Sequence, residues 1–226
     1  MGLDFPHIWG VFVTHDHADH IKAVGVIGEK YHVPVYTTRK IHEGINRSYC
    51  VTQELSTCQK FIETSETIDL GEFHITAFPV SHDASDSVGY SVEYKGKTFT
   101  FATDLGYIDD LAAKYLIDSD YLVLEANYDE RMLENGPYPL HLQNRIKSDT
   151  GHMSNYQTAV FLADNFSKRW KYVFLCHLSK DNNFPDLACL TVKEHLRNSE
   201  IQDGELLEII PLERLCPSKM YLFDDE

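Results

Sequence analysis

Four side chains of the kinds that bind metal ions lie within six residues near the start of the chain: His15, His17, Asp19 and His20. In an extended segment residues i and i+2 point to the same side, so His15 and His17 can reach one cation together. Asp19 and His20 follow where the chain turns, and they can bind a second cation. Zinc and manganese accept this mixture of imidazole and carboxylate ligands. The run therefore predicts a metal site at the end of an apolar strand.

Three more candidate ligands each follow a predicted strand. His82 comes after the segment 78–81, Asp104 after 99–103 and His177 after 172–176. In layered α/β folds the loops at strand ends converge and carry chemistry. Each of these residues alone is compatible with an ordinary structural role. Together with the histidine-rich run they predict two sets of ligands.

The elements expected to position these residues alternate between strands and helices. Apolar or alternating segments predict strands at residues 8–13, 33–37, 73–80, 88–94, 97–102, 121–125, 172–176 and 206–210. Helices are expected at 20–32, about 39–48, 109–116, from an N-cap at Ser154 to about 166, and 185–197. Lys95-Gly96 predicts a tight turn within a β-meander. This interleaving predicts α/β sheets covered by helices.

The composition is that of an acidic globular protein. With 43% hydrophobic and 24% charged residues among 226, we expect one domain covering residues 1–226. The formal net charge of −15 disfavours a passive nucleic-acid-binding module. It disfavours a nuclease less, because bound divalent cations reverse the local potential.

Location is predicted from apolar segments and cysteines. No apolar stretch reaches the ~20 residues needed to span a bilayer, so we expect no membrane association. No signal peptide is recognisable in residues 1–15. The five cysteines form no CxxC pair. Reduced thiols in a cytoplasmic protein are the simplest interpretation.

The motifs together resemble the metallo-β-lactamase fold superfamily. Its HxHxDH signature stands here as residues 15–20, and its later ligands match His82 in PVSHDA, Asp104 in FATDLGY and His177 in LCHLSKDNN. The resemblance implies an αββα sandwich that holds two divalent metal ions, zinc or manganese. It implies one metal on His15, His17 and His82, a second on Asp19, His20 and His177, and Asp104 as the bridge.

One branch of the superfamily matches more of the chain. The segments SHDASDSVGY, TDLGY, LEANYDERMLENGPYP, GHMSNYQTA and HLSKDNN resemble the YycJ/WalJ-like branch, described as metal-dependent DNA exonucleases of bacteria. The similarity covers nearly all of residues 8–184. LEANYD, GHMSN and HLS also follow the order of motifs in tRNase Z, a phosphodiesterase.

Two features depart from the family pattern. Fourteen residues precede His15, where members carry a longer segment, so we expect a sandwich that lacks part of its N-terminal sheet. Tyr128 stands where a histidine is expected, so no role is assigned there.

The predicted activity is that of a binuclear hydrolase, a phosphodiesterase acting as a DNA exonuclease through a metal-bridging hydroxide. Asp19 would lie beside the nucleophilic water. His152, in GHMSN, is the candidate proton donor to the leaving alkoxide, oriented by Glu125; a capping-loop histidine is the alternative. Ser154 is expected to cap a helix. Four basic residues either line a phosphate path or are ordinary solvated charges: Lys22, Arg145, Lys147 and Lys180.

The ligand set alone does not choose a substrate, because this fold hosts unrelated chemistries. Thioester hydrolysis of the glyoxalase II kind uses the same HxHxDH set; GHMSN favours the nuclease, whereas the acidic charge favours a small substrate. β-Lactam hydrolysis is less favoured because His20 and Asp104 are typical of other branches. A diiron redox role is less favoured because such a site normally has a glutamate at the position of His17. A catalytically impaired, metal-stabilised interaction module is the non-enzymatic alternative, and the oligomeric state is left open.

Overall fold

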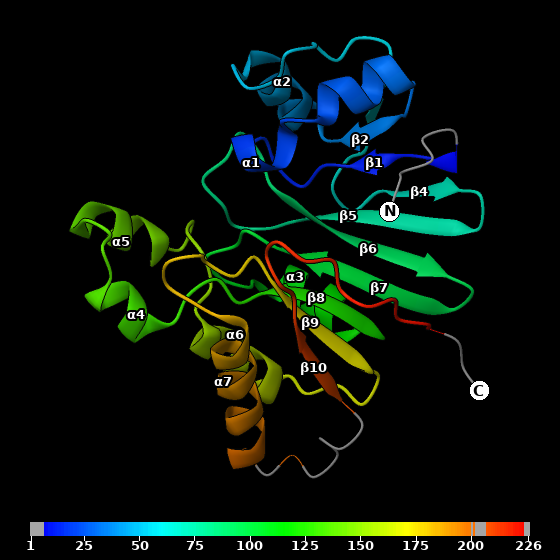
Figure 1. Cartoon of the computed structure of the whole chain (residues 1–226). Coiled ribbons are helices and arrows are strands. Elements are labelled where there is room, and N and C mark those ends of the chain that lie inside the picture. Colours follow the sequence, from blue (N-terminus) through cyan, green and yellow to red (C-terminus); the bar gives the residue numbers. More distant parts are fainter. Residues whose placement is uncertain (1–6, 200, 202–206, 224–226) are drawn as a thin grey trace.

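A computed structural model describes residues 7–199, 201 and 207–223 and contains two β-sheets (Figure 1). The smaller sheet consists of β1 (Val11–Phe12), β2 (Val35–Thr37) and β3 (Gln59–Phe61), all parallel, in the order β1-β2-β3. Its connections contain α1 (Ala18–Ile21), the π-helical turn η2 (Val26–Lys30) and α2 (Arg39–Arg47). Figure 1 shows these helices gathered at the end of the molecule beyond the smaller sheet.

The larger sheet has seven strands in the order β10-β9-β8-β7-β6-β5-β4. β4 (Thr67–Leu70), β5 (Phe73–Pro79), β6 (Val88–Tyr94) and β7 (Lys97–Ala102) form an antiparallel meander. β8 (Tyr121–Glu125), β9 (Tyr172–Cys176) and β10 (Glu208–Pro211) continue it in parallel. Lys95 and Gly96 both adopt positive φ angles, 49° and 75°, as a type I′ hairpin turn requires.

Five helices accompany the larger sheet: α3 (Asp110–Ile117), α4 (Glu130–Asn135), α5 (Leu140–Ile146), α6 (Asn155–Asp164) and α7 (Pro185–Asn198). Asp109 and Asp129 cap α3 and α4, and Ser154 forms a capping box with Gln157 at the start of α6. Figure 1 shows α6 and α7 packed side by side, and α4 and α5 standing out to one side as an arm.

Two apolar clusters lie on opposite faces of the larger sheet. One packs β5 and β6 against the smaller sheet and its helices, with Val35, Ile45, Ile75, Ala77 and Tyr90 among its members. The other packs the parallel strands against α3, α6 and α7. Successive side chains of β5 point to opposite faces of the sheet, so Ala77 packs in the first cluster and Phe78 in the second.

The α/β prediction is confirmed, and four strands have the predicted bounds: 88–94, 97–102, 121–125 and 172–176. The strand predicted at 8–13 was wrong in extent, because only Val11 and Phe12 pair with β2. The helix predicted at 20–32 is instead split between α1, which begins at Ala18, and η2. Leu206, where the last strand was predicted to begin, lies outside the described residues. β3, β4, α4 and α5 were not predicted.

Three further observations bear on the sequence predictions. The smaller sheet has three short strands in the described part of the chain. Among the described residues, no helix is both long enough and apolar enough to cross a lipid bilayer. All five cysteines are free thiols.

Candidate metal centre

The N-terminal ligand loop, residues 13–20, leaves β1 in extended conformation. The Thr14 carbonyl accepts a hydrogen bond from Val88 N at 2.9 Å, and His15 forms a β-bridge with Ser87. This pairing fixes the loop against the start of β6 and lets alternate side chains point together. His17 is the N-cap residue of α1, whose single turn then carries Asp19 and His20.

His15, His17 and His82 converge, with ligand atoms of all three within 4.8 Å of one another. His17 Nε2–H donates to the Asp83 carbonyl at 3.1 Å, and His82 Nδ1–H donates to the Gly151 carbonyl at 3.1 Å. These acceptors assign the protons, so the unprotonated atoms are His17 Nδ1 and His82 Nε2. Those two atoms face each other 3.2 Å apart.

The third nitrogen of this group is His15 Nε2, which is buried and has no hydrogen-bond partner in the described residues. Facing lone pairs repel unless a cation lies between them. Zinc bound tetrahedrally to nitrogens at ~2.0–2.1 Å would hold them roughly 3.3 Å apart, which matches the observed spacing. The donor set therefore fits a metal ion.

A second group contains Asp19, His20 and His177. Asp104 lies beside it, with Oδ2 3.4 Å from His20 Nε2 and Oδ1 3.3 Å from His177 Nδ1. The same Asp104 Oδ1 is 3.8 Å from His82 Nε2. The buried Asp104 carboxylate is thus close to ligand-type atoms of both groups, as a bridging residue must be.

His82, Asp104 and His177 are called the strand-end ligands, since they follow β5, β7 and β9. Asp104 and His177 have φ angles of 58° and 54°, in the left-handed region that non-glycine residues seldom adopt. Such conformations persist only where surrounding contacts impose them. Here Leu105 N donates to Glu125 Oε2 at 2.9 Å, and Asn127 Nδ2 donates to the His177 carbonyl at 2.8 Å.

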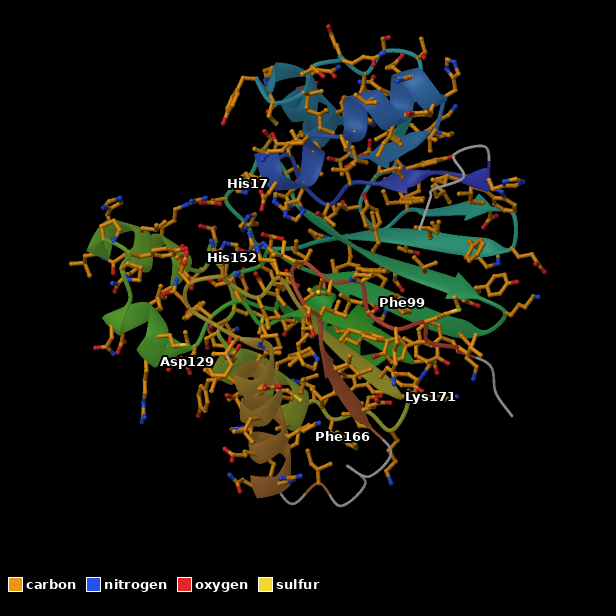
Figure 2. The ribbon with its side chains drawn as sticks, in the orientation of Figure 1. His17, Phe99, Asp129, His152, Phe166 and Lys171 are labelled. Atoms are coloured by element: carbon orange, nitrogen blue, oxygen red, sulfur yellow. The ribbon has the colours of Figure 1, made fainter. Side chains whose placement is uncertain are left out.

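Glu125, the last residue of β8, is completely buried behind these ligands. Its Oε1 accepts hydrogen bonds from His152 Nδ1 and His177 Nδ1, both at 2.8 Å. Burial alone would raise the pKa of Glu125, but the two histidines outweigh it and lower that pKa to about 2. The predicted contact between Glu125 and His152 is therefore present (His152 is labelled in Figure 2).

The histidines fall into two electrostatic classes. Burial lowers the pKa of His15 far below its ordinary value, and the neighbouring histidines lower it further. Burial also acts to lower the pKa of His177, but Glu125 and Asp104 outweigh it and raise that pKa to about 9. The same opposition gives His152 a raised pKa, with Glu125 as the main raising cause. His15 is thus held neutral before any cation binds, a cation bound to His177 would have to displace a proton, and His152 is favoured as a proton carrier.

A buried asparagine network that sequence reasoning left unassigned supports β8 where it ends. Asn183 Nδ2 donates to the carbonyls of Ala126 and Asn127 at 2.8 and 3.0 Å, and to Asn155 Oδ1 at 2.8 Å. Asn155 Nδ2 returns a bond to Asn183 Oδ1 at 3.0 Å. The segments GHMSN and HLSKDNN contain two of these residues, so their polarity in otherwise buried motifs was the available signal.

The four basic residues considered for a phosphate path have different surroundings. Arg145 pairs with Asp83, next to His82, whereas Lys147 pairs with Glu134 at 2.8 Å. Lys180 lines a cavity of about 510 Å³ together with Leu178 and Arg214. Lys22 is exposed at the end of α1.

Tyr128, which replaces the expected histidine, is buried with Leu133 and Ile146 at the base of the α4–α5 arm. Burial raises the pKa of Tyr128 to about 12, so its hydroxyl stays protonated. Its contacts are those of an anchor for the arm.

Comparisons with known proteins identify relatives of this arrangement. A family model described as a beta-lactamase superfamily domain matches residues 2–177. The chain is 33% identical over 219 residues to exodeoxyribonuclease YycJ of Bacillus anthracis, covering 96% of this chain and 82% of that protein. It is 34% identical over 194 residues to exodeoxyribonuclease WalJ of Streptococcus pneumoniae serotype 2, covering 86% and 72%. The metallo-β-lactamase fold protein YhfI of Bacillus subtilis has a similar structure, with a TM-score of 0.61, 17% identity and coverage of 93% and 77%.

Proposed function

The chain belongs to the metallo-β-lactamase superfamily as a YycJ/WalJ-like member, and from this we propose that it is a binuclear phosphodiesterase that degrades DNA as an exonuclease. The coarser statement, a metal-dependent hydrolase, follows from the family. The observation that carries the finer proposal is the convergence of seven ligand-type side chains, six of them around Asp104, with His15 Nε2 buried and unpartnered in the described residues.

The two groups of ligands would hold two cations. We assign His15, His17 and His82 to one, and Asp19, His20 and His177 to the other, with Asp104 between them. Two divalent ions, zinc or manganese, would polarise a phosphoryl oxygen and activate a water for attack. They would also give an acidic protein a local positive potential where a phosphate must bind.

The protein's own residues then handle protons. The Asp19 carboxylate, with its side chain 70% exposed at the open side of the site, accepts a hydrogen bond from the attacking water. His152 Nδ1–H is engaged by Glu125, so its Nε2 is the atom that carries the proton for the leaving oxygen. Glu125 acts through His152 and His177, and we assign it a positioning role.

DNA is the proposed substrate because YycJ of Bacillus anthracis and WalJ of Streptococcus pneumoniae, which are 33% and 34% identical to this chain, are both named exodeoxyribonucleases. The competing thioester hydrolase would use the same ligands. A metal-stabilised interaction module would bind cations and turn nothing over. Substrate assays separate all three hypotheses.

The experiment combines metal analysis with digestion of 5′-phosphorylated double-stranded DNA in added manganese. We expect mononucleotide or short-oligonucleotide release that chelation with EDTA abolishes and manganese restores. S-Lactoylglutathione hydrolysis is measured in parallel under the same conditions. A folded, two-metal protein that leaves DNA intact while cleaving the thioester would refute the nuclease proposal, and one that cleaves neither would favour the interaction module.

Two other expectations stay predictions: a single domain over residues 1–226, and a cytoplasmic location.

A further inference from the structure

One ion pair joins the edge of the metal centre to the α4–α5 arm. Arg145 Nε donates to Asp83 Oδ2 at 2.5 Å, and Arg145 Nη2 donates to Asp83 Oδ1 at 3.0 Å. This is the two-point geometry by which guanidinium and carboxylate groups orient each other. The pair therefore fixes the plane of the Arg145 side chain.

Both partners are tied to the site. Asp83 directly follows His82, its carbonyl accepts the His17 Nε2 proton, and its Oδ1 is 3.7 Å from both His17 Nε2 and His82 Nε2. Arg145 lies in the last turn of α5, and the next residue, Ile146, accepts a hydrogen bond from His152 N at 2.8 Å. The guanidinium is thus held between the loop of His82 and the loop of the proposed proton donor.

Arg145 has N–H donors that its ion pair with Asp83 does not use. A guanidinium carries five N–H donors, and Asp83 uses two of them. The Arg145 side chain is 54% exposed, so the other donors are accessible to a ligand. Their planar arrangement matches two oxygens of a phosphate, and Asp83 need not be displaced.

The location distinguishes Arg145 from the chain's other cations. The ion pairs that lysine and arginine form in the described residues include Lys95–Glu72, Lys147–Glu134, Arg169–Asp120 and Arg145–Asp83. Only the last involves a residue next to a proposed ligand. In a chain of net charge −15, a cation so placed is unlike an average surface residue.

We propose that Arg145 binds a backbone phosphate of the polynucleotide next to the one being cleaved, through the donors that Asp83 leaves free. The inference rests on the proposed nuclease function and identifies a residue through which the protein would bind its DNA substrate. The contact is non-covalent and lies outside the two ligand groups.

Two substitutions with opposite charge effects test the proposal. Arg145→Gln removes the cation, whereas Asp83→Asn keeps Arg145 and removes the charge that neutralises it. The probe is a fluorescein-labelled DNA duplex with phosphorothioate linkages, titrated with manganese-loaded full-length protein at several salt concentrations. Lys147→Gln is the matched control, since Lys147 lies two residues away on the same arm but pairs with Glu134. Thermal melting checks that all variants are folded.

We expect Arg145→Gln to raise Kd by about tenfold, as the loss of one charge-assisted hydrogen-bonded contact implies. The slope of log K against log salt should fall by about 0.9, the value for one duplex phosphate. Asp83→Asn should lower Kd or leave it unchanged, and Lys147→Gln should leave both Kd and the slope unchanged.

Equal weakening by Arg145→Gln and Asp83→Asn would overturn the proposal, because a purely structural pair fails in the same way from either side. Equal weakening by Lys147→Gln would also overturn it, by showing a general charge effect. A wild-type protein that neither binds nor degrades the unmodified duplex would overturn the proposed function, and this inference with it.

Discussion

The N-terminal ligand loop and the strand-end ligands contribute to the same proposed metal centre by different means. The loop places His15, His17, Asp19 and His20 within six residues, after a strand only two residues long. The strand-end ligands come one at a time from β5, β7 and β9, separated by more than twenty residues of sequence each. One half of the site is therefore specified locally, and the other half by tertiary structure.

The contacts that hold the loop ligands differ from those that hold the strand-end ligands. Part of what holds the loop is exposed, such as the hydrogen bonds that Ser85 N and Oγ donate to Asp16 at 3.1 and 2.6 Å. The strand-end ligands are held by the completely buried Glu125 and the asparagine network behind it. A buried, charged network is costly to disturb, whereas a solvated contact is readily replaced by water. We expect changes behind the strand-end ligands to have the larger effects.

The largest effect is expected for Asp104→Ala. This change removes the carboxylate that lies close to both ligand groups, so turnover should fall by more than about 10³-fold, or roughly 4 kcal/mol of transition-state stabilisation. DNA digestion with manganese measures it. Asp110→Asn, an exposed substitution in the first turn of α3, is the control. An Asp104→Ala protein with unchanged turnover would refute the bridging assignment.

Glu125→Gln should be the next most damaging change. The substitution removes a buried negative charge that accepts hydrogen bonds from His152 and His177. The amide nitrogen of the new glutamine would face another donor, either those two histidine nitrogens or Leu105 N. We expect a loss of about 3 kcal/mol in the free energy of unfolding, and a 10–100-fold weaker second cation. Chemical denaturation and metal titration measure the two quantities. If both stayed at wild-type values, Glu125 would have no positioning role.

Asp16→Ala tests the loop side of the comparison. The change frees two donors of Ser85, an exposed residue, so the expected cost is about 1 kcal/mol in the free energy of unfolding. We expect the affinity for the first cation to fall by at most about tenfold. Asp69→Ala, at an exposed residue whose carboxylate pairs with His74, serves as the control. A cost equal to that of Glu125→Gln would break the contrast between the two regions.

The smallest effect is expected for a pH-dependent contact in the N-terminal half. Hydrogen bonds from the backbone of Ser56, then from Thr57 and Cys58, hold the pKa of Glu29 far below its ordinary value of 4.5. A lowered folded-state pKa contributes stability above pH ~4.5 that is lost as the pH falls towards the folded-state value. We expect Glu29→Gln to cost about 1 kcal/mol at pH 7 and to flatten the acid limb of the stability curve. Thermal melting of both proteins from pH 7 to pH 3 measures this, and parallel curves would contradict it.

The same contrast explains what could be predicted from the sequence. The loop ligands could be predicted from their spacing alone. The meander could be predicted because the alternation of apolar and polar residues and the Lys95-Gly96 turn indicate which neighbouring strands pair. The resemblance to a known family was needed to link His82, Asp104 and His177, since nothing local joins them. The roles of Asn127 and Asn183 could not be predicted, because hydrogen bonds across distant segments leave no periodic pattern. The short α4 and α5 were missed for a related reason: their stability comes from packing with Tyr128.

The number of tightly bound divalent cations per chain tests the central claim most directly. It is measured by elemental analysis of dialysed wild-type protein and of the His82→Ala and His177→Ala variants, each of which removes a ligand from one group. The account predicts about two ions in the wild-type chain and about one in each variant. A wild-type chain that retains one ion or none, with melting behaviour that shows it is folded, would contradict the two-cation site.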